Sequence, residues 1–556
     1  MIKLRSLFLL MSLIACLRIL YAQNTVGLLS IKGTQVSEGY NLIYPYSQST
    51  VFLIDLCGEV VHRWIDFSGR EPGCSVYLLP NGNLIRCSRD KDFSMDAFVA
   101  GGFGGYVDIL SWENKMLYSY TLNDSLYRLH HDVAPMPNGH ILMLAWEKIT
   151  PLQAIAQGRD PNTLPNDALW PDKILEWDPQ SDSIVWEWRA WDHLIQDRDS
   201  LLPNFGVIAK HPEHIDVNFS AAGGQPDWMH TNYIDYNPVL DQIMISVRNF
   251  NEIWIIDHST SLEEAREDSG GRSGKGGGIL YRWGNPSAYR RDDEQLHLLK
   301  AQHYAHWTKP DALPLEDQFG EVAIYNNLQE FNKSAAILIK VDFDTVNWNY
   351  PIEDSIFGPQ VPERIILHPD DNNILAFSNT VSNVQKLANG NILIFAGRWG
   401  YAYEIDEMDE VVWEYRIPMR NGASVSQGSV LDLDDNLTFH MTRYDQDYAA
   451  FSNRRFSQGS YLELNPDEGF CTLQTSSVPQ FSSESTLQIW PNPVSNFLHI
   501  IGEVPNNISC LILDLNSQVV KKLYTLDNSV DVTNLPNGLY LLKTSNGAMS
   551  RFVVLH

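Results

Sequence analysis

The chain between residues 25 and 470 consists of short apolar runs in which Val, Ile, Tyr and Trp recur, separated by turn residues. The turns contain Asn-Gly, Pro and Asp, and few stretches show the spacing of an amphipathic helix. Short runs of β-branched and aromatic residues bounded by such turns are typical of β-strands. The pattern therefore predicts an all-β body.

Two kinds of sequence unit recur within this body. The first is a strand, an acidic turn and a second strand that ends near a tryptophan, as at 51–64, 173–188, 253–283 and 403–415. The second is an Asn-Gly turn followed by a strand, as at 78–85, 135–144 and 386–395. Asn-Gly supplies the positive φ angles of a tight turn, so each unit is interpreted as part of a hairpin. Hairpins repeated over so long a stretch predict a β-propeller rather than a two-sheet sandwich.

Insertions interrupt the repeats and prevent a blade count from their spacing. One insertion covers 152–167, and a second, rich in Gly and Ser, covers 263–278. The second insertion is typical of an exposed loop, and a functional lid is the alternative interpretation.

Both ends of the chain differ in composition from the body. Residues 1–22 follow the basic, apolar, small-residue order of a secretory signal peptide, although residues 13–16 also fit a lipoprotein cleavage site. Residues 472–487 are a Ser/Thr-rich linker, and 488–556 alternate apolar and polar positions as in a small β-sandwich. The expected domains are a signal peptide (1–22), a propeller (23–471), a linker (472–487) and a C-terminal module (488–556).

Charge and cysteine content narrow the class of protein. With 40 basic against 68 acidic residues the formal net charge is −28, which disfavours nucleic-acid binding. After residue 22 no window approaches the ~18 uninterrupted apolar residues of a membrane helix. The five later cysteines include no CxxC pair, so neither a zinc framework nor a disulfide scaffold is predicted. One disulfide among Cys57, Cys74 and Cys87, or free buried thiols, remain alternatives.

Histidine carries the strongest chemical signal, since imidazole can act as nucleophile, base or metal ligand near neutral pH. The histidines gather in four segments: His130, His131 and His140; His211 and His214; His230; and His297, His303 and His306. We expect no metal site, because neither 211–214 nor 303–306 shows metal-ligand spacing on an evident helix.

The position of each histidine relative to the predicted strands bears on its role. His230 and His303 lie at strand ends, where propeller loops reach the mouth of the channel, and this favours a functional role. His131 precedes Asp132 and a hairpin strand. A structural role is the simpler interpretation there, and orientation of a catalytic imidazole by the carboxylate is the alternative.

At these residues the body resembles the bacterial arylsulfate sulfotransferase family. The resembling segments occur in the family's order at 130–142, 227–257, 279–289, 302–307, 321–327 and 383–415. The resemblance implies a six-bladed propeller that moves a sulfuryl group from a phenolic sulfate to another phenol through a sulfohistidine, with further histidines and an arginine around the sulfate. It also implies that no cofactor and no nucleotide sulfate donor take part.

Two family histidines have counterparts in this chain. His230 stands in the family's DWxHxN motif and His303 in its QH motif, which implies that both donate to the sulfate or protonate the phenolic oxygen. The family's arginine is not matched in 325–334, where Asn326 and Asn327 stand and Lys333 is the nearest substitute.

The family's nucleophile is not matched either. The corresponding segment, 395–406, contains no histidine, and Arg398 and Tyr401 occupy that neighbourhood. His306 and His131 are the candidates for the sulfated residue, unless the reaction has been lost or changed.

Two further residues are candidates for contacts with the substrate. Arg248 lies in ISVRN, which resembles a family segment, and would bind sulfate oxygens; a surface ion pair is the alternative. Trp228 would stack on an aromatic ring, although most of the 16 tryptophans are expected to pack between blades.

The C-terminal module resembles the type IX sorting domain of Bacteroidetes. The resemblance rests on the PNP, DLNSQVV and NLPNGLYLLK motifs at 491–493, 514–520 and 534–543. It implies export through the periplasm to the cell surface or medium, with the type IX machinery as partner. The overall prediction is an exported sulfotransferase for small aromatic sulfates and phenols. The alternatives are a non-catalytic ligand-binding propeller and a quinone-dependent dehydrogenase, for which the sequence shows no calcium and quinone constellation.

Overall fold

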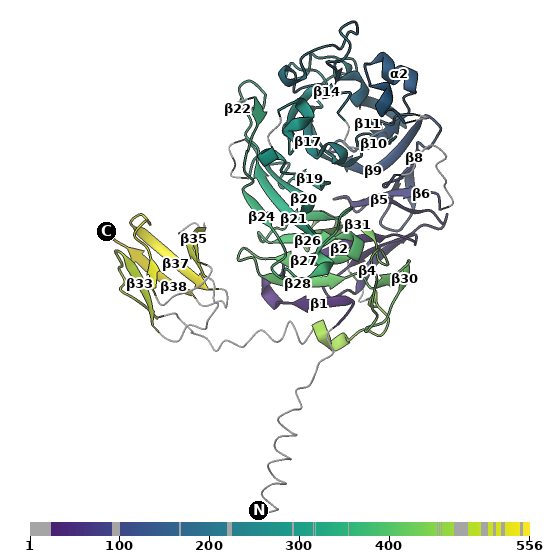
Figure 1. Cartoon of the computed structure of the whole chain (residues 1–556). Coiled ribbons are helices and arrows are strands. Elements are labelled where there is room, and N and C mark those ends of the chain that lie inside the picture. The colour runs from purple at the N-terminus through teal and green to yellow at the C-terminus, as the bar shows by residue number, and fades with distance from the viewer. Residues whose placement is uncertain are drawn as a thin grey trace, which may run out of the picture.

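The computed structural model is built from small sheets whose strands are almost all antiparallel, and its helices are few and short, which confirms the all-β prediction (Figure 1). It describes residues 24–556 apart from 92–99, 166–167, 220–224, 292–293, 315, 317, 354, 453, 455, 457–458, 472–487, 502–509, 515–518, 524–528 and 545–548. The predicted signal peptide at 1–22 and the linker at 472–487 lie outside the described residues.

Six antiparallel sheets of four or five strands make up the described part of the body. The first three, each in spatial order, are β31 (Thr438–Asp445), β2 (Gly39–Pro45), β3 (Thr50–Ile54), β4 (Val60–Ile65); β5 (Glu71–Leu78), β6 (Leu84–Arg89), β7 (Tyr106–Leu110), β8 (Met116–Thr121); and β9 (Tyr127–Pro135), β10 (Ile141–Glu147), β11 (Asp172–Asp178), β12 (Ser183–Arg189). The other three are β15 (Thr231–Asn237), β16 (Gln242–Val247), β17 (Glu252–Asp257), β18 (Ile279–Trp283); β19 (His303–Trp307), β20 (Glu321–Glu330), β21 (Lys333–Lys340), β24 (Arg364–Ile366); and β25 (Asn383–Lys386), β26 (Ile392–Ala396), β27 (Tyr401–Ile405), β28 (Val411–Arg416), β1 (Gly27–Ile31).

One edge strand of each sheet faces the same centre. β5 contacts β9, β9 contacts β15, β15 contacts β19, β19 contacts β25, β25 contacts β31 and β31 contacts β5, so these six strands form a closed circle. Apolar side chains fill the space between neighbouring sheets, and Trp64, Trp146, Trp177, Trp188, Trp254 and Trp413 are among the largest fully buried ones. This packing fixes the ends of the central strands relative to one another, and the candidate site lies there.

The hairpin units predicted from the sequence are confirmed. Each strand, acidic turn and strand unit forms an antiparallel pair: β3 with β4, β11 with β12, β17 with β18 and β27 with β28. The three Asn-Gly turns join the first and second strands of their sheets, and their glycines Gly82, Gly139 and Gly390 have φ angles of 88°, 89° and 90°. A left-handed glycine lets each chain reverse without a Cβ clash.

The circle of sheets is closed by pairing between distant parts of the chain. The late strand β31 pairs with β2, and the early strand β1 pairs with β28. A disulfide joins Cys57 to Cys471 across 414 residues, whereas Cys74 and Cys87 are buried free thiols. The considered pairing among Cys57, Cys74 and Cys87 is therefore wrong, because the partner of Cys57 comes from the far end of the body.

A network of charged side chains joins the sheet of β9–β12 to the neighbouring sheet of β15–β18. His258 lies 2.7 Å from Asp241 and 3.1 Å from Glu176, and Glu176 also lies 2.6 Å from His140. Burial opposes the charge on His258, but its bonds to Asp241 and Glu176 raise its pKa to about 9. His140, a member of the histidine-rich segment, therefore has a structural contact far from the centre.

Short elements fill the loops between the sheets. They are α2 (Pro151–Ala156); η1 (Gly33–Gln35), η2 (Pro161–Thr163), η3 (Ala190–Asp192), η4 (Ile208–Lys210), η5 (Arg248–Phe250), η6 (Glu264–Arg266), η7 (Pro286–Tyr289), η8 (Glu294–Leu296), η9 (Ile374–Ala376), η10 (Gly397–Trp399) and η11 (Ala449–Phe451); and the strand pairs β13 (Leu194–Ile195) with β14 (Ile215–Asp216), β22 (Ile352–Glu353) with β23 (Ile356–Phe357), and β29 (Met419–Arg420) with β30 (Ala423–Ser424). Thr150 caps α2 and forms a capping box with Gln153.

The C-terminal residues form two further antiparallel sheets, shown in yellow in Figure 1. In spatial order these are β32 (Gln488–Trp490), β33 (Phe497–Ile501), β36 (Ser529–Asp531), and β35 (Val519–Leu523), β34 (Cys510–Leu513), β37 (Gly538–Thr544), β38 (Met549–Val554). Leu498 and Val530 of the first sheet and Ile512, Leu542 and Phe552 of the second belong to one buried cluster. This module therefore has a hydrophobic core of its own.

Candidate functional site

Three histidines lie at the ends of central strands in three successive sheets. His131 lies in β9, His230 directly precedes β15, and His303 opens β19. The pairing register shifts at each of these points, which is the mark of a β-bulge. His131 and His230 have φ angles of 50° and 55°, an uncommon conformation for a residue with a side chain. The bulges turn these side chains out of the regular alternation and toward the centre.

His131 is buried, and its side chain contacts the neighbouring His130. Its Nδ1 lies 2.9 Å from Nδ1 of His130, and Nε2 of His130 lies 3.4 Å from Oδ1 of Asp172. The latter two atoms form no hydrogen bond with each other. In the tautomer with the proton on Nδ1 of His131, this N–H donates to Nδ1 of His130. In this arrangement Nε2 of His131 carries a free lone pair.

The environment of His131 keeps its imidazole neutral. Burial lowers its pKa well below the usual range, and the neighbouring His230 and His130 lower it further. Asp132, the carboxylate considered as the orienting group, instead accepts hydrogen bonds from the Tyr77 hydroxyl at 2.8 Å and the Ile234 amide at 3.1 Å. Asp132 therefore does not hold the His131 ring, and the side-chain contact of that ring is with His130.

His230 faces His131 and has a carboxylate partner. Their ring centroids are 4.5 Å apart, and the rings are nearly perpendicular. Nδ1 of His230 forms a short contact with Oδ2 of Asp227, a residue that is 7% exposed. The carboxylate accepts a hydrogen bond from Nδ1 of His230 and so fixes the orientation of the ring, with Nε2 on the side away from Asp227.

Arg248 supplies positive charge beside the imidazoles. It opens η5, and its amide donates to the carbonyl of His230 at 3.3 Å. Its side chain donates to Oδ1 of Asn249 at 3.2 Å, and within the described part of the chain no carboxylate lies within ion-pair distance of its guanidinium. The charge of Arg248 lowers the pKa of both His131 and His303. Arg248 is half-buried beside the imidazoles, and its role as a ligand of sulfate oxygens stays a prediction.

A glycine segment lies directly against the two imidazoles. A Cβ built on Gly102 would lie 2.1 Å from Nε2 of His131, and one built on Gly101 would lie 3.8 Å from Cε1 of His230. The carbonyl of Gly102 accepts the His131 amide at 2.7 Å. Only a residue without a side chain allows the His131 ring to occupy its position at Gly102.

His303 belongs to the same cluster, but both of its ring nitrogens have partners in the protein. Nδ1 lies 2.7 Å from Oδ1 of Asn327, and Nε2 accepts the Val381 amide at 3.2 Å. Burial and the charge of Arg248 lower its pKa to about 3. In this arrangement His303 helps to shape the site and has no ring N–H left to donate to a sulfate oxygen.

The other candidate residues lie apart from the cluster. His306 lies 3.2 Å from the Tyr304 carbonyl, and burial lowers its pKa to about 4. No contact among the described residues joins it to His131 or His230. Lys333 pairs with Asp371 at 2.9 Å on the surface.

The remaining three candidates are engaged elsewhere. Arg398 pairs with Asp434 and donates to Asn379 at 2.7 Å. Tyr401 is fully buried, and its hydroxyl donates to Glu414 at 2.5 Å. Trp228 is also fully buried and donates to the Phe219 carbonyl at 2.8 Å, so it packs in the core and offers no face to a ligand.

Several residues of the cluster were not found from the sequence. Asp227 lies three positions before His230 in DWMH, and Gly102 lies in the motif GGFGG at 101–105; both motifs were available as signals. Asp172 belongs to a different hairpin from His130, so no local sequence pattern links the two residues.

Comparison with known proteins gives two matches to protein families. The profile of the family described as Arylsulfotransferase (ASST) matches residues 43–337, which is more than half of the 556-residue chain. The profile described as Secretion system C-terminal sorting domain matches residues 488–554. This type IX sorting domain marks the protein for export to the cell surface or for secretion. Among the described residues no helix has the length and apolar character needed to cross a membrane.

No curated protein matches the chain. Among solved structures it is similar to a protein of unknown function from Bacteroides caccae, with 10% identity and a TM-score of 0.37, over 73% of this chain and 99% of that one. It is also similar to virginiamycin B lyase from Staphylococcus aureus, with 10% identity and a TM-score of 0.30, over 75% of this chain and 99% of that one.

Proposed function

The chain belongs to the arylsulfotransferase (ASST) family, and from this premise we propose that it transfers a sulfuryl group from a phenolic sulfate ester to a phenolic acceptor through a histidine intermediate. The observation that carries the proposal is the convergence of His131, His230 and Arg248 at the central strand ends. The six sheets then correspond to the blades of a six-bladed propeller over 23–471, followed by a linker at 472–487 and a small sandwich at 488–556.

His131 is the proposed nucleophile, in place of the unmatched family position. It is neutral because of its burial, and its Nε2 lone pair is free of protein partners among the described residues. His306, the other candidate, lies outside the cluster. A neutral imidazole that is oriented through its second nitrogen can attack sulfur without first losing a proton.

His230 is the proposed acid and base. In the first half of the reaction Nε2 of His131 bonds to sulfur, the bond from sulfur to the phenolic oxygen breaks, and protonated His230 gives its proton to the leaving oxygen. In the second half His230 takes the proton of the acceptor hydroxyl, whose oxygen attacks sulfur as the N–S bond breaks. Asp227 holds the His230 ring through Nδ1 and so keeps Nε2 in place between these steps.

Arg248 is the proposed ligand of the sulfate oxygens. The transferring group carries negative charge on its oxygens, and a fixed cation in a largely buried site stabilises such charge more than it would in water. His303 and Asn327 are positioning residues in this proposal.

The test is nitrophenol release from 4-nitrophenyl sulfate in the presence of phenol, with the full chain and its variants. His131→Gln is expected to abolish release, whereas the exposed control His297→Gln retains it. His230→Gln should lose more activity toward phenyl sulfate than toward 4-nitrophenyl sulfate, because nitrophenolate leaves without protonation.

Two outcomes would contradict the proposal. Loss of activity in His306→Gln but not in His131→Gln would move the nucleophile to His306. Absence of release across a panel of aryl sulfates would favour a non-catalytic ligand-binding protein.

A further inference from the structure

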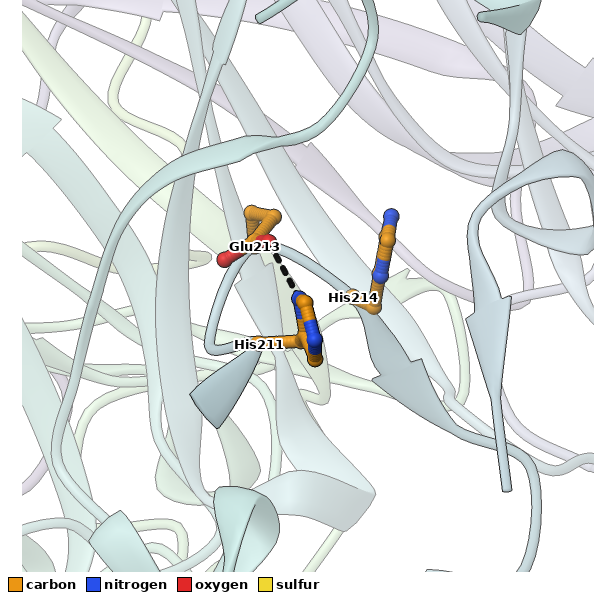
Figure 2. A group of neighbouring side chains, drawn as sticks. All are labelled: His211, Glu213 and His214. Carbon is orange, nitrogen blue, oxygen red and sulfur yellow. Dashed lines mark hydrogen bonds and ion pairs between the residues drawn. The ribbon is translucent and has the colours of Figure 1, made fainter. Parts of the chain in front are cut away.

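A second group of histidines lies away from the central cluster, in the loop before β14. His211, Glu213 and His214 each offer one ligand atom, and these atoms lie within 4.8 Å of one another. Nδ1 of His211 is 2.9 Å from Oε1 of Glu213 (Figure 2). The side chains are 46%, 32% and 18% exposed, so an ion can reach them from solvent.

The backbone that carries these side chains is held at several points. The His214 amide donates to the His211 carbonyl at 3.1 Å, which closes a turn containing Pro212. Arg282, buried and paired with Glu252, donates to the carbonyls of Pro212 at 3.3 Å and His214 at 3.1 Å. The turn places the two imidazole rings at a centroid distance of 5.8 Å and an angle of 24°. The two rings are therefore brought together by a fixed turn and not by flexible chain.

A carboxylate from another segment orients one of the imidazoles. Nε2 of His214 lies 2.9 Å from Oδ1 of Asp268, which belongs to the Gly/Ser-rich insertion at 263–278. A carboxylate that accepts a hydrogen bond from Nε2 of His214 leaves Nδ1 as the lone-pair donor. A carboxylate partner on the second ring nitrogen is the usual arrangement around a metal-bound histidine.

We propose that His211, Glu213 and His214 bind a divalent transition-metal ion such as Zn²⁺, with Asp268 orienting His214. Two neutral imidazoles and one carboxylate are ligands that Zn²⁺ accepts, and a water molecule would complete the tetrahedron. The metal replaces the hydrogen bond between His211 and Glu213. Metal–ligand bonds of about 2.0–2.2 Å place tetrahedral ligand atoms about 3.4 Å apart. The His211 and Glu213 atoms, now 2.9 Å apart, must therefore separate slightly, and ligand atoms up to 4.8 Å apart must approach, which rotation of exposed side chains allows.

The site has a structural consequence for the 263–278 insertion. Because Asp268 holds a metal-binding imidazole, metal binding and the position of this insertion are linked. The metal would therefore fasten the insertion to the 211–214 turn. This site is separate from the proposed transfer chemistry, so its test does not depend on activity.

The experiment measures Zn²⁺ binding by calorimetry to the purified full chain after removal of metal with a chelator. The wild type is expected to bind one equivalent that is lost in the double variant His211→Ala/His214→Ala. Asp268→Asn should weaken this equivalent by about 10–100-fold, the usual effect of losing an orienting partner. The exposed His297→Ala variant is the matched control and should bind as the wild type does.

Two further readouts complete the test. X-ray absorption of the Zn²⁺-loaded wild type should show two imidazole ligands, and circular dichroism should show that each variant keeps the wild-type fold. Equal Zn²⁺ binding by the wild type and the double variant would overturn the proposal. An unchanged affinity in Asp268→Asn would overturn the orienting role of Asp268.

Discussion

The replacement of Gly102 by alanine tests whether the position of the His131 ring sets the rate. A Cβ at this position would lie 2.1 Å from Nε2 of His131, whereas unbonded heavy atoms prefer about 3.5 Å. The ring must therefore move by about 1.4 Å, the difference between these two distances. A displacement of about 1 Å in a catalytic group can cost roughly 100-fold in rate. Gly102→Ala is expected to lower nitrophenol release by at least about that factor.

Gly139→Ala is the matched control for the backbone strain that Gly102→Ala introduces. Gly102 and Gly139 have similar φ angles of 78° and 89°, but a Cβ on Gly139 meets no atom within 4 Å. Both variants lose about 1–2 kcal/mol of stability for an alanine in the left-handed region. Gly102→Ala should lose about 1–3 kcal/mol more, because its Cβ overpacks the buried His131 ring. Only Gly102→Ala should lose activity. The assay compares kcat for 4-nitrophenyl sulfate with the urea midpoint of each variant. Equal activity in the two folded variants would refute the catalytic importance of the His131 position.

Three other predictions concern the body. Cys57→Ser should lower the free energy of unfolding, measured in urea, by about 2–5 kcal/mol. Reduction of the wild type should lower it by the same amount, and reduction of the variant should cause no further loss. Asp241 and Glu176 raise the pKa of His258 to about 9, so their contacts with His258 stabilise the fold fully below pH 6.5 and this stabilisation is lost as the pH rises through 9. In thermal melts His258→Gln should flatten this pH dependence of stability. An unchanged pH dependence would contradict the assignment. Arg248→Ala should lower kcat by about 100–1,000-fold. The kcat of Arg398→Ala should stay near that of the wild type, because Asp434 already pairs with the guanidinium of Arg398. A large loss of kcat in Arg398→Ala and none in Arg248→Ala would assign the anion site to Arg398.

The comparison of Arg248 with Arg398 shows what the sequence could and could not predict about the site. Arg248 opens η5 and Arg398 is the second residue of η10, and each of these short 3-10 helices lies between the second and third strands of its sheet. The local pattern therefore makes both arginines equal candidates. They differ because Asp434 comes from the loop before β31 and pairs with Arg398. That carboxylate is distant in sequence, and only the fold brings it to the arginine.

Local signals were sufficient for the hairpins and for the positions of two histidines. Asn-Gly turns act within a few residues, and His230 and His303 could be placed at strand ends from the adjoining apolar runs. The contact of Asp172 with His130 joins separate hairpins, and the disulfide of Cys57 spans 414 residues. Such contacts depend on how the sheets pack, which no local pattern encodes.

The fold contributes to the proposed chemistry by holding the ends of three central strands close to one another. His131 comes from one sheet, His230 and Arg248 come from the next, and His303 comes from the one after. Since the central strands pack in a closed circle, a change in one sheet should move groups in its neighbours. We therefore expect substitutions between these sheets to affect kcat more than substitutions in the outer strands.

The most direct test of the central claim is to trap the covalent intermediate. The full chain is incubated with 4-nitrophenyl sulfate without acceptor, quenched in base and digested, and the peptides are searched by mass spectrometry for one added SO₃ group. The account predicts the modification on His131, its disappearance when a phenol is added, and its absence in His131→Gln. A sulfated residue other than His131, or a burst of nitrophenol without any sulfated histidine, would contradict the account.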